Sequence, residues 1–259
     1  MTNMENLADL LREAGALMLS YQQPRVYAKG GHADFVTEAD VAVQALLMER
    51  LAVRYPSAKF YAEEKKDNVL TDGLTFIIDP IDGTTNYFRK RSMSCISVGA
   101  VEGKRAVFGA VYNPYTDEVY HAEAGCGAYC GEERLHASRE PLESALIGLG
   151  TSPYYSELMA LTGRTVGALL PLCADLRRTG SAALELCDIA AGRSDGCFEW
   201  LLQPWDYCAG ALLVEEAGGQ CGNILGGEVT FEKGIPFMAA GSGCFDALRA
   251  ALQAAYHQA

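Results

Sequence analysis

A short apolar segment that leads straight into two acidic residues constrains this chain more than any other feature. Residues 76–78 have the composition of a buried strand, and Asp79, Pro80 and Asp82 follow almost directly. Because Pro80 fixes a turn, the two carboxylates can point at the same spot. Two carboxylates at such a short separation repel each other in a poorly solvated cleft unless a cation lies between them. Hard oxygen ligands suit Mg²⁺, so this segment predicts a magnesium site.

The residues after Asp82 favour a phosphate site beside that metal. Gly83 lets the backbone turn without steric cost, and Gly83, Thr84 and Thr85 can open a helix whose free N–H groups face an anion. A metal pair beside a helix N-terminus is an arrangement that handles phosphate. On its own, such a short pattern is more typical of a solvated acidic turn.

Three further segments place acids where they can join the first two. Glu63 follows an apolar strand, Asp40 lies in the first turn of a predicted helix capped by Thr37, and Asp206 begins another helix. Taken singly, a surface salt bridge explains Glu63 and capping explains Asp206. Their joint occurrence favours a single cation-binding pocket.

The chain divides into two halves with different patterns. Residues 95–130 read as strands separated by tight turns, which predicts an antiparallel meander. After Pro141, strands alternate with helices, which favours a mixed or parallel sheet. We therefore predict an N-terminal half over 1–142 and a C-terminal half over 143–259, packed as one α/β (α+β) unit.

Composition excludes several classes of function. The net charge is −12, from 33 acidic and 21 basic residues, which argues against a nucleic-acid or anionic-membrane binder. The acidity fits a protein that holds cations, although solubility alone also explains it. Nine scattered cysteines, an odd number, predict free thiols and a cytoplasmic location. We expect no signal peptide, and no apolar stretch approaches the ~20 residues of a membrane span.

Three segments, in chain order, resemble the inositol monophosphatase family, the lithium-sensitive, Mg²⁺-dependent phosphatases related to fructose-1,6-bisphosphatase. They are residues 34–40, 78–86 and 205–219, and the central one matches the family signature residue for residue. Ala62, where glycine often stands, and Cys208, where a small residue is usual, are mild departures. The resemblance implies a layered αβαβα sandwich, with an antiparallel-sheet half followed by a mixed-sheet half, and a homodimer.

The resemblance also implies two to three Mg²⁺ ions and their ligands. Glu63, Asp79 and the backbone carbonyl of Ile81 would bind the first ion. Asp79, Asp82 and Asp206 would bind the second, and a third, weaker ion would sit near Glu63. The metals would lower the pKa of an attacking water and neutralise charge on the phosphoryl group.

The catalytic and substrate residues follow from the same resemblance. Thr84 with Asp40 would orient and deprotonate the water, assisted by Glu63, and backbone N–H groups of Gly83 and Thr84 would hold the phosphate. A carboxylate such as Glu199 accepts two ring hydroxyls, and it also suits a ligand ammonium. The implied substrate contacts are Asp82, Gly83, Thr84, Thr85, Gly180, Ser181, Ala182, Glu199 and Asp206.

Three basic residues have open roles. Lys29 lies in a glycine-rich segment, 29–33, where the family has a mobile catalytic loop, although a lone loop lysine is usually solvated. Arg177 and Arg178 precede Gly180 and could bind a second phosphate, as a fructose-bisphosphatase needs. We favour a strand end in solvent, or a subunit contact, for both arginines.

We therefore predict a Mg²⁺-dependent phosphomonoesterase for myo-inositol-1-phosphate or a similar small polyol phosphate. The alternatives are a fructose-1,6-bisphosphatase, a histidinol-phosphatase and a phosphoadenosine-nucleotide phosphatase. An alternative of another class is a binding partner of the transcription machinery, since some bacterial relatives act in that way. Every expected ligand is intact in this chain, which favours the enzyme.

Overall fold

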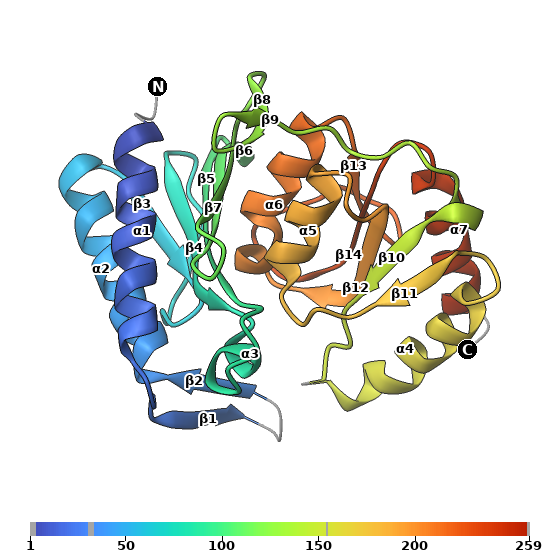
Figure 1. Ribbon diagram of the computed structural model, residues 1–259, viewed down its shortest axis with the longest axis horizontal. Helices are drawn as coiled ribbons and strands as arrows, with labels where there is room; N and C mark the ends of the chain where they lie inside the picture. Colours follow the sequence, from blue (N-terminus) through green and yellow to red (C-terminus); the bar gives the residue numbers. More distant parts are fainter. Residues whose placement is uncertain (1–3, 31–33, 154, 258–259) are drawn as a thin grey trace.

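Two β-sheets alternate with three pairs of helices in a computed structural model that describes residues 4–30, 34–153 and 155–257 (Figure 1). One pair covers the outer face of the first sheet, a second pair lies between the sheets, and a third covers the outer face of the second sheet. The pairs are α1 (Met4–Ser20) with α2 (Glu38–Arg54), α5 (Ala182–Ala190) with α6 (Pro204–Glu216), and α4 (Ser156–Leu169) with α7 (Phe245–His257). The αβαβα sandwich is thereby confirmed.

The first sheet has seven strands in chain order, and every neighbouring pair except β3 and β4 is antiparallel. The predicted meander is confirmed. Its strands are β3 (Lys59–Ala62), β4 (Thr75–Asp82), β5 (Cys95–Glu102), β6 (Arg105–Asn113), β7 (Glu118–Glu123), β8 (Gly127–Cys130) and β9 (Glu133–Arg134). We expected the fourth strand to end at Ile78, but β4 continues to Asp82 with a register shift against β5 after Asp79. Such irregularities re-aim side chains at the end of a strand.

The second sheet is mixed and has the order β11-β10-β12-β14-β13. Strand β10 is parallel to both of its neighbours, whereas β14 is antiparallel to both of its own. The strands are β10 (Leu146–Leu149), β11 (Asp175–Arg177), β12 (Gly196–Leu202), β13 (Gln220–Asn223) and β14 (Ile235–Ala240). The strands of the first sheet all precede those of the second in the chain, and the division into two halves at 142/143 stays a prediction.

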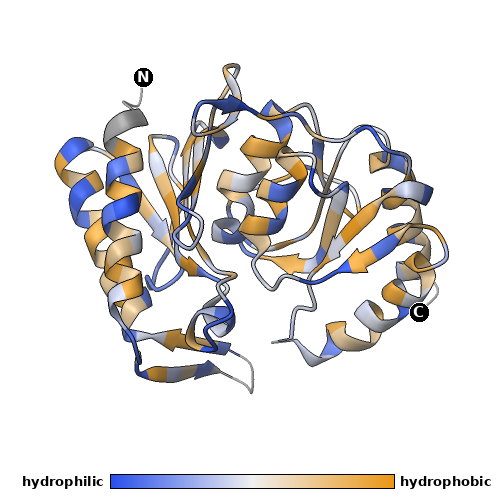
Figure 2. Ribbon diagram, in the orientation of Figure 1, coloured by the Kyte–Doolittle hydropathy of each residue, from blue (hydrophilic) through white to orange (hydrophobic). Residues whose placement is uncertain are grey.

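Helix α6 lies unusually close to the first sheet. A Cβ atom on Gly99 of β5 would meet Cys208 Sγ at 2.5 Å, and one on Gly109 of β6 would meet the carbonyl oxygen of Ala209 at 2.6 Å. Glycine at these strand positions lets the helix backbone approach. The helix is apolar around most of its circumference, as expected for one buried between two sheets (Figure 2). This packing fixes the start of α6, and therefore Asp206, against the end of β4.

The short elements lie at one end of the first sheet. Strands β1 (Val26–Gly30) and β2 (Asp34–Thr37) form a two-stranded antiparallel ribbon beside α3 (Thr84–Phe88). We expected residues 29–33 to form a loop, yet Lys29 and Gly30 belong to β1; residues 31–33 lie outside the described part of the chain. A 3₁₀ turn, Leu142–Ser144, leads into the second half. In the part of the chain that the structure covers, no helix is long and apolar enough to cross a bilayer.

Candidate active site

Three aspartates meet where the two halves face each other. Asp79 and Asp82 come from the end of β4, and Asp206 comes from the first turn of α6. One carboxylate oxygen from each lies within 4.8 Å of the other two. The side chains are removed from bulk water, since Asp79 is 2% and Asp82 7% exposed. The structure thus brings together three of the five acids that we predicted to share one pocket.

Each aspartate uses hydrogen bonds to fix its direction. Asp79 accepts the backbone N–H of Ile81 at 3.0 Å, which stabilises the irregular end of β4. Asp206 accepts the backbone N–H of Gln203 at 2.7 Å and closes a capping box at the start of α6. Asp206 is thus a helix cap as well as a member of the cluster, so the two interpretations of this residue are compatible.

Burial and mutual repulsion make the cluster a site for cations. Burial, together with the charges of Glu63 and Asp82, raises the pKa of Asp79 well above its usual range. Burial and the charge of Asp82 do the same to the pKa of Asp206. A divalent ion relieves both effects, because it replaces lost hydration and separates like charges. Three converging carboxylate oxygens are ligands of the kind that Mg²⁺ prefers.

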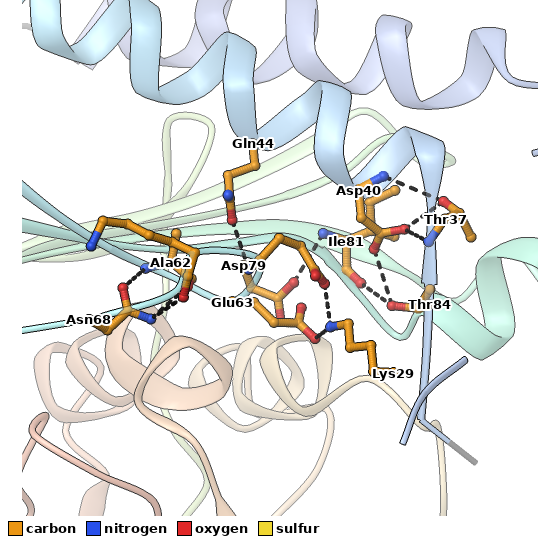
Figure 3. A network of polar contacts seen from close by, with 12 residues as sticks. Lys29, Thr37, Asp40, Gln44, Ala62, Glu63, Asn68, Asp79, Ile81 and Thr84 are labelled. Carbon is orange, nitrogen blue, oxygen red and sulfur yellow. Dashed lines mark hydrogen bonds and ion pairs between the residues drawn. The ribbon is translucent and has the colours of Figure 1, made fainter. Parts of the chain in front are cut away.

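Lys29 reaches this cluster from β1 (Figure 3). Its ammonium group lies 2.7 Å from Glu63 Oε1 and also forms an ion pair with Glu64. Burial lowers the pKa of Lys29, but the charge of Glu63 and hydrogen bonds to both glutamates outweigh burial and raise it. We expected a solvated lysine; the side chain is instead only 23% exposed, because strand β1 directs it inward. Lys29 supplies a positive charge beside the acids.

Asp40 and Thr84 form a second polar group next to the cluster (Figure 3). Asp40 is fully buried and accepts the backbone N–H of Thr37 at 2.7 Å. The Thr84 hydroxyl lies 3.3 Å from Asp40 Oδ1 and 3.1 Å from the carbonyl oxygen of Ile81. One hydroxyl proton serves one acceptor at a time, so Thr84 can donate to either. Burial raises the pKa of Asp40, although both hydrogen bonds from Thr37 oppose this effect.

A cavity of about 560 Å³ opens over these groups. Every residue that we predicted for metal or substrate binding lines it, whereas Asp40 lies behind Thr84, outside the lining. The predicted residues in the wall are Glu63, Asp79, Ile81, Asp82, Gly83, Thr84, Thr85, Gly180, Ser181, Ala182, Glu199 and Asp206.

Two further carboxylates line the part of the cavity wall that the second half of the chain supplies. Glu199 accepts the backbone N–H of Ser152 at 2.7 Å and its hydroxyl at 3.1 Å. Glu185 accepts the N–H of Thr179 at 2.9 Å and its hydroxyl at 2.7 Å. Burial raises the pKa of Glu199 and that of Glu185 to about 7 each.

Sequence reasoning missed Ser152 and Glu185. The signal was present in the segment 148–152, which contains two glycines. A Cβ atom on Gly150 would stand 1.8 Å from Glu199 Oε2, and one on Gly148 would stand 2.9 Å from Glu185 Oε2. The two glycines therefore make room for the two carboxylates.

Asn86 links the phosphate turn to the second half. Its side-chain N–H₂ donates to the carbonyl oxygens of Met93 at 2.7 Å and Thr179 at 2.9 Å. The preceding turn needs Gly83, whose φ is +83°, in the left-handed region that favours glycine. Helix α3 is only five residues long, but it begins where the sequence predicted.

The two arginines before Gly180 have different surroundings. Arg177 pairs with Asp175 at the end of β11, as expected of a strand end. Arg178 is exposed as well, but it also lines the cavity and donates to Thr151 Oγ1 at 3.1 Å; a subunit contact of either arginine stays a prediction.

The chain is similar to known proteins over nearly its whole length. The sequence profile described as "Inositol monophosphatase family" matches residues 2–258. An inositol-1-monophosphatase of Rhizobium meliloti is 40% identical over 215 residues, which are 79% of this chain and 77% of the relative. The Nus factor SuhB of Escherichia coli is 38% identical over 222 residues, 83% of each chain.

A solved structure of an IMPase from Thermotoga maritima superposes with a TM-score of 0.89 at 29% identity. The match covers 100% of this chain and 99% of that one. The profile and the solved structure both cover the two halves of the chain. The chain belongs to the inositol monophosphatase family.

Proposed function

We propose that this chain is a Mg²⁺-dependent phosphomonoesterase that hydrolyses inositol-1-phosphate, or a similar small polyol phosphate, to the alcohol and phosphate. The observation that carries the proposal is the convergence of Asp79, Asp82 and Asp206 within 4.8 Å on one cavity. The name of the Rhizobium relative supports the substrate class.

Five groups would hold two to three metal ions: the carboxylates of Glu63, Asp79, Asp82 and Asp206 and the carbonyl of Ile81. Their oxygens are the donors that Mg²⁺ prefers. When bound, Mg²⁺ would lower the pKa of a coordinated water and neutralise charge on the phosphoryl oxygens. The protein fixes the ligands beforehand, because Asp82 and Asp206 are already held by hydrogen bonds.

Thr84 and Asp40 would position the nucleophile. The Thr84 hydroxyl can accept from a water while it donates to Asp40, whose carboxylate is fixed by Thr37. Backbone N–H groups of Gly83, Thr84 and Thr85 at the start of α3 would hold phosphate oxygens. They lie in the cavity wall, next to the acids.

The alcohol part of the substrate would lie toward the second half. Glu199 would accept ring hydroxyls, with Gly180 and Ala182 in contact with the ring. Ser181 is 1% exposed and its hydroxyl donates to Asp82. Ser181 would therefore affect substrate binding through Asp82 or through its own backbone atoms. Asp82 and Asp206 would contact the leaving oxygen from the metal side.

A panel of phosphate esters, assayed with Mg²⁺, tests the substrate. We expect inositol-1-phosphate to be hydrolysed, and histidinol phosphate and phosphoadenosine nucleotides to be poor substrates. Asp82→Asn should abolish hydrolysis of every ester while the protein stays folded. Wild-type activity in Asp82→Asn would contradict the metal site. A wild-type chain that hydrolyses no ester would favour the alternative role as a binding partner of the transcription machinery.

Three further properties are proposed from the family: a homodimer, a cytoplasmic location and inhibition by lithium. The lack of a membrane-spanning helix in the described residues is compatible with the location. Sedimentation analysis tests the homodimer, and assays in LiCl test the inhibition by lithium. A monomer at all concentrations, or turnover insensitive to Li⁺, would contradict them.

A further inference from the structure

Glu63 differs from the three clustered aspartates because it lies in a turn. Strand β3 ends at Ala62, and residues 62–65 form a tight turn that is closed by a hydrogen bond from the N–H of Lys65 to the carbonyl oxygen of Ala62 at 3.1 Å. Glu63 and Glu64 occupy the two central positions of this turn. The position of the Glu63 side chain in the cavity wall therefore depends on how firmly the turn is held.

The turn follows an edge strand, so the sheet supports it on one side only. In the described part of the chain, β3 is the first strand of its sheet and pairs only with β4. On that side, the N–H of Glu63 donates to the carbonyl oxygen of Ile78 at 3.1 Å. Because successive residues of a strand direct their backbone groups to opposite sides, those of Ala62 face the open edge. Ala62 is fully buried, so these groups need partners other than water.

The side-chain amide of Asn68 supplies those partners at the open edge (Figure 3). Its Oδ1 accepts the N–H of Ala62 at 3.0 Å, and its Nδ2 donates to the carbonyl oxygen of Ala62 at 2.8 Å. The same Nδ2 donates to the carbonyl oxygen of Lys65 at 3.2 Å. A primary amide offers the donor and the acceptor of a peptide group, so one side chain holds both ends of the turn.

A second amide, from helix α2, holds the middle of the turn (Figure 3). Gln44 Oε1 accepts the N–H of Glu64 at 2.9 Å, and Gln44 is only 8% exposed. Neither Gln44 nor Asn68 belongs to the cavity wall. Both amides therefore act on the site through the turn that carries Glu63.

We propose that Asn68 and Gln44 are positioning residues for metal binding, which fix the turn at residues 62–65 so that the Glu63 carboxylate is held ready for an ion. The inference rests on the proposed role of Glu63 as a metal ligand. Groups that orient a metal ligand contribute roughly 10–100-fold to affinity. The effect is confined to Glu63, because Asp82 and Asp206 have hydrogen-bond partners of their own.

A double-mutant cycle, measured by calorimetric titration of Mg²⁺ without substrate, tests this coupling. Asn68→Ala should raise the half-saturating Mg²⁺ concentration about tenfold in the wild-type background, but less than about twofold in a Glu63→Gln background, where the ligand that it orients is already impaired. Gln44→Ala should behave in the same way, and it tests the turn independently if Asn68→Ala does not fold. The matched control is Asn223→Ala, whose amide accepts the N–H of Leu225 in a turn of the second half. It should match its parent in both backgrounds.

Equal losses of Mg²⁺ affinity in the two backgrounds would overturn the inference, since an amide that only stabilises the fold affects every ligand alike. Unchanged affinity in both amide variants, or in Glu63→Gln alone, would overturn it too. Ser181→Ala, which acts on Asp82, should by contrast keep its effect in the Glu63→Gln background. Turnover is judged separately: a wild-type chain that cleaves no ester contradicts the proposed function, whereas the Mg²⁺ titrations decide the positioning role without any substrate.

Discussion

The hydroxyl of Ser181 donates to Asp82 Oδ2 across 2.6 Å, so the second half of the chain holds an acid of the first. The backbone N–H of Ala183 donates to the same oxygen at 2.7 Å. Asp82 therefore enters the cluster with one oxygen already engaged, and one of its carboxylate oxygens lies within 4.8 Å of oxygens of Asp79 and Asp206. The two halves must be docked before the proposed metal site is complete.

Ser181→Ala should weaken Mg²⁺ binding about tenfold, because partners that orient metal ligands contribute 10–100-fold to affinity. Calorimetric titration of Mg²⁺ without substrate measures this effect. Ser152→Ala is the matched control, since its hydroxyl contacts Glu199, which is not one of the three clustered aspartates. It should keep Mg²⁺ affinity and raise KM. Equal Mg²⁺ affinity in Ser181→Ala and wild type would show that Ser181 does not orient Asp82.

Asp79→Asn should stabilise the metal-free protein and remove its response to Mg²⁺. Asp79 is buried and repelled by neighbouring carboxylates, so its neutral isostere should raise the free energy of unfolding by about 1 kcal/mol without metal. Wild type should gain about 2.7 kcal/mol at a Mg²⁺ concentration 100 times its Kd, and the variant should gain little. Urea unfolding in EDTA and in Mg²⁺ gives both values.

The control for this comparison is Asp246→Asn, on the exposed surface of α7. It should change stability slightly and equally in both conditions. In EDTA, Asp79→Asn should be more stable than wild type, and in Mg²⁺ it should be less stable. Asp246→Asn should show no such reversal. If Asp79→Asn is less stable than wild type without metal, the hydrogen bond from Ile81 N–H to Asp79 stabilises the fold by more than the repulsion between carboxylates destabilises it.

The sequence predicted the acidic part of the site well because its signals are local. Apolar strands that run into acids place carboxylates at a strand end, and the capped helices at Thr37 and Gln203 position Asp40 and Asp206. The central signature fixed the turn at Gly83. Each of these features depends on residues only a few positions apart.

The basic and substrate-facing parts were harder to predict because they depend on pairing between distant segments. Lys29 turns inward only because β1 pairs with β2. Ser152 meets Glu199 only because β10 and β12 are parallel neighbours. Strand β13 was missed because its polar, glycine-containing sequence, Gln220–Asn223, has no apolar alternation and gains its order from β14.

Glu185→Gln should flatten the pH dependence of stability. Burial raises the pKa of Glu185 to about 7, from 4.5, so the folded protein keeps a proton that the unfolded chain has released in this window. The stability from this proton is complete below about pH 4.5 and is lost as the pH rises through about 7. Between these limits, wild type should lose on the order of 3 kcal/mol relative to Glu185→Gln.

Urea unfolding of both proteins in EDTA, at about pH 5 and about pH 8, measures this difference. Other buried acids of the cluster titrate in both proteins and cancel in the comparison. Glu157→Gln, on the exposed side of α4, serves as the control and should follow wild type. Parallel pH profiles for wild type and Glu185→Gln would show that Glu185 is ionised in the folded protein throughout the range.

Two glycine substitutions should have opposite effects on stability. Gly109→Ala would place a Cβ atom 2.6 Å from the carbonyl oxygen of Ala209, so α6 must shift, at about 1–3 kcal/mol. Gly163→Ala, in α4, meets nothing within 4 Å and should stabilise by about 0.5–1 kcal/mol, because it reduces the entropy of the unfolded chain.

Since α6 carries Asp206, Gly109→Ala should also weaken Mg²⁺ binding, and Gly163→Ala should not. Thermal unfolding and calorimetric Mg²⁺ titration check both effects; a Gly109→Ala protein with normal Mg²⁺ affinity would show that Asp206 does not depend on the contact between α6 and the first sheet.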